Sequence, residues 1–137
     1  MSSEPDVLHE IRLFVDAARE ELQSANLNLA NDFYSACASR TYYAVFYSAT
    51  ALLKTRGLSF SKHTAVLSAF RQHFVKTGEF SVEVSDFYKI AFETRHTGDY
   101  ERQIQFEPEV LRKNLDRARD FVAEVEKWLQ RHNFLSA

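Results

Sequence analysis

The chain has 137 residues, a net charge of -2 and 45% hydrophobic residues, so it can bury one core and is not a disordered polypeptide. Three glycines, two prolines and one cysteine argue against an all-β fold rich in turns and exclude an internal disulfide. With no signal-like N-terminus and no apolar run of membrane-spanning length, we expect a cytoplasmic protein with no membrane association.

Hydrophobic periodicity predicts the helices in chain order. The ranges are about Pro5–Leu27, Ala30–Arg56, Ser61–Gly78, Val82–Thr97 and Pro108–His132. Ser61 and Ser81 are plausible N-caps, and a glycine follows or ends each of the three middle helices. The sequence therefore predicts a single all-α domain over residues 1–137, an up-and-down bundle of four to five helices.

The second predicted helix is apolar on nearly every side, which places it at the centre of the bundle or at a dimer interface. Its stretch SRTYYAVFY, residues 39–47, nevertheless contains an arginine and three tyrosines. At 100° per residue, Arg40, Tyr43 and Tyr47 share one face, whereas Tyr42 points to the opposite side. A polar strip thus runs along an otherwise apolar helix.

A guanidinium group that faces protein needs a carboxylate, several carbonyl groups or a bound anion. The best internal candidate for Arg40 is Asp99, just after Gly98, because a bidentate pair would pin the chain where it leaves the fourth helix. The alternative is that Arg40, Arg95 and His63 face a common cleft that binds phosphate.

Charge is distributed unevenly along the chain. Residues 33–78 contain no Asp or Glu and six bases, namely Arg40, Lys54, Arg56, Lys62, Arg71 and Lys76. These bases either pair with acidic helices inside the bundle or line a groove for phosphate, nucleotide or RNA. Five scattered histidines and a single cysteine provide no metal-binding motif, so we expect neither a metal nor another cofactor.

Three motifs occur in order along nearly the whole chain. They are SRTYYAVFYSATALLKTRG from Ser39, Lys62-His63, and RHTGDY from Arg95 to Tyr100. Together they resemble the HEPN domains, small all-α proteins, and in particular the stand-alone prokaryotic branch with R-x-YYA and R-x-x-x-DY motifs.

The resemblance implies a helical bundle that forms a homodimer and is often paired with a minimal nucleotidyltransferase as a toxin–antitoxin system. It also implies that active members are metal-independent endoribonucleases with an R-x4-6-H motif. In this chain the positions after Arg95 that would hold the histidine hold Tyr100, Glu101 and Arg102 instead. Arg56 and His63 have the formal spacing, but they span a helix end and are not assigned.

Three functional hypotheses follow. The first is a HEPN protein without ribonuclease activity that binds nucleotide or RNA through a basic cleft. It would form a toxin–antitoxin-like pair with a nucleotidyltransferase partner. The cleft would be lined by Arg40, Tyr43, Tyr47, His63, Arg95 and Tyr100. The second is a ribonuclease toxin with a variant site, for which the catalytic candidates are Arg95, His96 and His63. The third is a dimeric structural adaptor in which the Arg40–Asp99 pair only locks helices together.

Overall fold

The computed structural model describes residues 4–100 and 106–136, with side chains given outside residues 97–100. The described residues form five α-helices and one π-helical segment, and they contain no strand. In chain order these are α1 (Glu4–Ala30), α2 (Tyr34–Lys54), α3 (His63–Phe70), η1 (Arg71–Val75), α4 (Val82–Tyr100) and α5 (Pro108–Arg131). The predicted all-α fold is confirmed.

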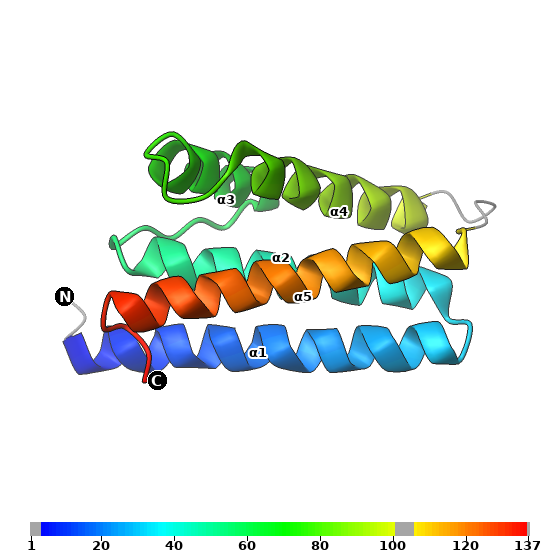
Figure 1. Ribbon diagram of the computed structural model, residues 1–137, viewed down its shortest axis with the longest axis horizontal. Coiled ribbons are helices and arrows are strands. Elements are labelled where there is room, and N and C mark those ends of the chain that lie inside the picture. The colour runs from blue at the N-terminus through cyan, green and yellow to red at the C-terminus, as the bar shows by residue number, and fades with distance from the viewer. Residues whose placement is uncertain (1–3, 101–105, 137) are drawn as a thin grey trace.

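The long helices run lengthwise and reverse direction at each successive step from α1 to α2, α4 and α5 (Figure 1). The short α3 and η1 lie at the end of the bundle where α2 finishes and α4 starts. Helix α2 contacts α1, α3, α4 and α5, so its expected central position is confirmed and explains why it has no polar face. No helix in the described ranges has the length and apolarity to cross a bilayer.

The turn between α1 and α2 lies later in the chain than the sequence indicates. Helix α1 continues to Ala30, and Asp32 then takes a left-handed backbone conformation with φ 62°. The backbone N–H of Phe33 donates to the carbonyl of Asn28 at 2.8 Å, which closes the turn before α2 begins at Tyr34. The expectation that α2 starts near Ala30 was therefore wrong.

Two local signals are confirmed. Gly57 has φ 72° and follows α2, and the N–H of Leu58 donates to the carbonyl of Leu53 at 3.0 Å. This left-handed position after a helix favours glycine because a side chain there would be strained. Ser81 caps α4, since its hydroxyl accepts a hydrogen bond from the N–H of Val84 at 3.1 Å.

The third helix differs most from the prediction. It begins at His63, and its N-cap is Lys62, which provides no side-chain cap, so the assignment of Ser61 as cap was wrong. After Phe70 the chain widens into the π-helical segment η1, marked by the bond from the N–H of Lys76 to the carbonyl of Arg71 at 2.9 Å. This segment is only five residues long, about one turn, so it is too short to show a hydrophobic period of its own in the sequence.

The fourth helix is also longer than expected. Gly98 lies inside α4, which continues to Tyr100 instead of ending near Thr97. Tertiary contacts frequently override the weak helix-ending tendency of a single glycine.

Aromatic side chains fill the centre of the bundle. Phe70 is fully buried, and its ring centroid lies 5.5 Å from Phe121 of α5, 5.6 Å from Phe80 and 5.9 Å from Tyr88 of α4. Edge and tilted contacts at these separations are favourable for aromatic rings. They attach α3 and the start of α4 to the long helices, and this fixes the position of His63 at the start of α3.

The basic block of residues 33–78 is partly neutralised by acidic side chains of the same chain. Three of its six bases form ion pairs with acids of other segments: Arg40 with Glu21 at 3.2 Å, Lys54 with Glu10 at 3.3 Å, and Arg56 with Glu79 at 2.6 Å. Internal pairing therefore accounts for half of the block, as one of the two interpretations of the charge pattern predicts.

Candidate functional site

Tyrosine, histidine and arginine side chains meet where α2, the start of α3 and α4 come together. Helix α2 provides Tyr42, Tyr43 and Phe46, α3 provides its first residue His63, and α4 provides Arg95. These five residues are called the His63–Arg95 cluster below. Tyr42 is fully buried, whereas the other four side chains are half-buried and therefore reach the surface.

The imidazole of His63 is held on three sides by rings of α2. It stacks on Phe46 with centroids 4.4 Å apart, and the ring of Tyr43 is perpendicular to it, with centroids 5.8 Å apart. Its Nδ1 lies 3.0 Å from the hydroxyl oxygen of Tyr42. Burial, and to a smaller extent the positive charge of Arg95, lower the pKa of His63 below its ordinary value. His63 is therefore neutral at pH 7.

Arg95 lies against the same two tyrosines. Its guanidinium carbon is 5.5 Å from the ring centroid of Tyr43 and 5.7 Å from that of Tyr42, and its Nη2 donates to the Tyr43 hydroxyl at 3.3 Å. A guanidinium group stacked in this way gains cation–π attraction, and its planar fork of N–H donors fits a phosphate group. The cluster thus places a phosphate-type donor beside a neutral histidine.

The hydroxyl of Tyr42 keeps its proton in this setting. Burial raises the pKa of Tyr42 far above its ordinary value, and the positive charge of Arg95 offsets only part of that rise. Tyr42 therefore takes part in the cluster as a neutral hydrogen-bonding group.

The structure brings together three of the residues proposed from the sequence, namely Tyr43, His63 and Arg95. Tyr47 contacts Tyr43, with centroids 5.7 Å apart, but it also lines a surface groove between α1 and α2 with Phe14. His96 stacks on Phe92 at 6.1 Å and is exposed. The side chain of Tyr100 lies outside the described residues.

Arg40 was expected to face other protein segments, but it lies at the surface of the bundle. Its side chain is 48% exposed, and its Nη1 contacts Glu21 of α1 at 3.2 Å. The expected need for a partner is thus met at the surface by an acid of α1. The proposed pairing with Asp99 concerns a side chain outside the described part of α4, and it stays a prediction.

Tyr42 and Phe46 are members of the cluster that the sequence did not predict. On a helical wheel centred on Arg40, Tyr42 points to the opposite side. The α3–α4 side of α2 is centred near Phe46, which lies between Tyr42 and Tyr43 on that wheel. An excess of aromatic rings on one side of a central helix, followed by Lys62-His63, is the signal that could have located it.

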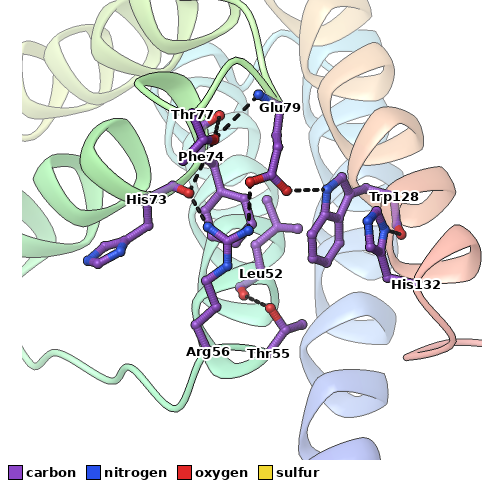
Figure 2. Close-up of polar contacts among 9 residues, drawn as sticks. All are labelled: Leu52, Thr55, Arg56, His73, Phe74, Thr77, Glu79, Trp128 and His132. Carbon is purple, nitrogen blue, oxygen red and sulfur yellow. Dashed lines mark hydrogen bonds and ion pairs between the residues drawn. The ribbon is translucent and has the colours of Figure 1, made fainter.

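Arg56 belongs to a different network, shown in Figure 2. Its guanidinium group lies 4.1 Å from the ring centroid of Phe74, pairs with Glu79 at 2.6 Å and donates to the carbonyl of His73. Glu79 also accepts a hydrogen bond from the indole N–H of Trp128 at 3.0 Å. Arg56 therefore ties the end of α2 to η1 and α5, and it is not part of the His63–Arg95 cluster.

No group of three or more His, Cys, Asp or Glu side chains arranged for a metal ion occurs among the residues that the structure describes. In the His63–Arg95 cluster, the imidazole of His63 is the one side chain of a metal-binding type. It lies beside the positive charge of Arg95, which would repel a metal ion. The chemistry of the cluster suits an anion.

Comparison with models of protein families shows which family the chain belongs to. The model of the HEPN domain matches residues 11–128. The chain belongs to the HEPN family. The resemblance seen in the R-x-YYA and R-x-x-x-DY motifs is thereby confirmed, and the His63–Arg95 cluster lies within the matched region of the HEPN domain.

Relatives of this HEPN domain are found in bacteria and archaea. A protein of Thermotoga maritima named "UPF0332 protein" is 44% identical over 113 residues, which cover 82% of this chain and 86% of the relative. Two proteins of Methanocaldococcus jannaschii are named "Putative toxin MJ0142" and "Putative toxin MJ0605". They are 31% identical over 92% of this chain and 33% identical over 69% of it, and these matches cover 86% and 71% of the relatives.

Proposed function

We propose that this HEPN protein binds the phosphate group of a nucleotide or of RNA at the His63–Arg95 cluster, without cleaving it. The observation that carries the proposal is the stacking of Arg95 against Tyr42 and Tyr43 beside a neutral His63. Stacking restricts the guanidinium group before a ligand arrives, so less entropy is lost when it binds phosphate. The aromatic rings at the surface are also suited to contact a base.

The absence of a histidine at positions 100 to 102, five to seven residues after Arg95, supports a binding role over cleavage. The residue at the first of these positions is Tyr100, whose type has an ordinary pKa near 10 and is a poor base at neutral pH. Phosphate binding needs only the donors, and it does not depend on a general base.

The proposal extends to the biological setting. The two relatives from Methanocaldococcus jannaschii, whose names contain the word toxin, support a role in a toxin–antitoxin-like pair. The proposed partner protein is a minimal nucleotidyltransferase, and the protein is proposed to be a cytoplasmic homodimer. The family resemblance supports the partner and the dimer, and the composition supports the location.

Titration of the full chain with ATP and with a short RNA tests the binding role. We expect Arg95→Ala to weaken the binding of whichever ligand the wild type binds by about tenfold or more, since a hydrogen-bonded charge is lost. The matched control is Arg119→Ala, which removes the same charge from an exposed α5 position that pairs with Asp116. Equal affinity of wild type and Arg95→Ala for both ligands would reject the proposal.

A second candidate function is a metal-independent endoribonuclease. One observation favours it: the fold brings His63 beside Arg95, although the two are far apart in sequence. In this reading His63 removes the proton of the ribose 2′-hydroxyl and Arg95 stabilises the charge on the phosphate.

Incubation of RNA with the wild type, His63→Ala and His96→Ala in a chelating buffer distinguishes the two functions. Cleavage that His63→Ala abolishes would establish the ribonuclease. Binding without cleavage above a buffer blank would favour the first proposal.

A further inference from the structure

The hydrogen bond between Tyr42 and His63 has a direction that the surroundings of Tyr42 determine. The side chain of Tyr42 is fully buried, and Nδ1 of His63, 3.0 Å away, is the one hydrogen-bond partner of its hydroxyl among the described residues. A buried hydroxyl hydrogen without an acceptor is costly. Tyr42 avoids that cost only if its O–H donates and Nδ1 of His63 accepts.

This direction fixes the tautomer of His63. A neutral imidazole carries one hydrogen, and an Nδ1 that accepts a hydrogen bond places that hydrogen on Nε2. The two ring nitrogens point in different directions, so Nε2 points away from the buried hydroxyl. Nε2 has no hydrogen-bond partner in the described ranges, and the side chain is half-buried, so a ligand can reach this N–H.

We propose that Tyr42 is a positioning residue that holds neutral His63 as the Nε2–H tautomer, which makes His63 a hydrogen-bond donor to a phosphate oxygen and not a proton acceptor. The donor role rests on the proposed function, whereas the tautomer does not. With Tyr42 bonded to Nδ1 and a hydrogen on Nε2, neutral His63 has no lone pair left with which to remove the proton of a 2′-hydroxyl.

The other polar groups of the cluster are donors as well. Arg95 donates through Nη2 to the oxygen of Tyr43, so the hydrogen of the Tyr43 hydroxyl is left for another acceptor. The guanidinium group of Arg95 is a donor only. Together with Nε2–H of His63, these groups select an oxyanion rich in lone pairs, such as a phosphate, over a ligand that must donate hydrogens.

Nitrogen-15 NMR of the ligand-free full chain tests the tautomer. At a pH above the titration of His63, we expect the Nδ1 resonance of His63 in the range of an unprotonated nitrogen and Nε2 in that of a protonated one. The signals are assigned by their loss in His63→Gln. In Tyr42→Phe we expect the Nδ1 resonance to move towards the position of a nitrogen without a hydrogen bond.

The matched control is Tyr88→Phe. Tyr88 is also buried and touches Tyr42, but its hydroxyl has no partner among the described residues. We expect this variant to leave the His63 signals unchanged. A hydrogen on Nδ1 in the wild type, or an Nδ1 resonance that Tyr42→Phe leaves in place, would overturn the tautomer.

The donor role is tested by comparing His63→Gln with His63→Ala in the titrations with ATP and with a short RNA. A glutamine amide carries N–H groups near the position of Nε2 but is no base. We therefore expect His63→Gln to bind within about threefold of the wild type and His63→Ala to bind about tenfold more weakly. Affinity of His63→Gln as low as that of His63→Ala would overturn the donor role. Failure of the wild type to bind either ligand would overturn both the donor role and the proposed function, whereas the NMR result would still decide the tautomer.

Discussion

The hydroxyl oxygen of Tyr42 lies 3.0 Å from Nδ1 of His63, across the loop that separates α2 from α3. The ring centroid of Tyr42 lies 6.4 Å from that of the buried Tyr88 and 5.6 Å from that of the half-buried Phe92, both in α4. His63 is thus attached to the aromatic core through a residue that has little freedom to move. The packed core therefore restricts the position of His63 in the candidate site.

Acidification should destabilise the protein through His63. Its pKa is lowered in the folded state by burial and by the charge of Arg95. The unfolded chain therefore takes up a proton near pH 6.5, before the folded protein does, so the contribution of His63 to stability is present above about pH 6.5 and is lost as the pH falls below it.

Urea unfolding of the wild type and of His63→Gln between pH 5 and pH 8 measures this effect. We expect the stability of the wild type to fall more steeply below about pH 6.5 than that of the variant. Parallel profiles would show that His63 titrates alike in the folded and unfolded states, contrary to the packing of its ring.

Glu79 should contribute to stability at neutral pH through the network of Figure 2. Its carboxylate accepts bonds from Arg56 at 2.6 Å and from Trp128 at 3.0 Å, and its side chain is 28% exposed. Loss of these charged hydrogen bonds in Glu79→Ala is expected to cost about 1–2 kcal/mol of unfolding free energy after allowance for solvent exposure.

The control for Glu79→Ala is Glu93→Ala, which removes an exposed surface pair with Lys89 at 3.8 Å and should change stability by less than about 0.5 kcal/mol. Burial alone would raise the pKa of Glu79, but hydrogen bonds from Arg56, Thr77 and Trp128 outweigh it and lower that pKa. The stabilisation is therefore present above about pH 4.5 and is lost on further acidification. An equal effect of both variants at pH 7 would show that the network adds nothing.

Arg40→Ala should leave the domain folded. Because Arg40 is 48% exposed and pairs with Glu21 at the surface, we expect a loss of about 1 kcal/mol or less in chemical unfolding. The structural-adaptor hypothesis requires a different outcome. A loss of about 3–5 kcal/mol would indicate that Arg40 also serves a buried acid, for which Asp99 is the candidate.

Periodicity was sufficient to predict the helices and the central position of α2, because burial of an apolar face dominates their formation. The Arg40–Tyr43–Tyr47 strip was harder to interpret, since a wheel gives directions on one helix but not which neighbours lie there. His63 and Arg95 come from segments that only tertiary packing brings beside Tyr42. The π-helical segment Arg71–Val75 is likewise too short for a hydrophobic period in the sequence to predict it.

Replacement of Tyr88 by phenylalanine should stabilise the domain. Tyr88 is fully buried among aromatic rings, and its hydroxyl has no hydrogen-bond partner among the described residues. A buried hydroxyl without a partner loses its hydrogen bonds to water on folding, at a cost of about 1–3 kcal/mol, and phenylalanine avoids that cost while keeping the ring. We expect thermal and urea unfolding to show Tyr88→Phe more stable by about 1 kcal/mol, and Tyr42→Phe less stable because it breaks the bond to His63. A destabilised Tyr88→Phe would show that the hydroxyl contributes to the stability of the folded protein, and it would contradict this prediction.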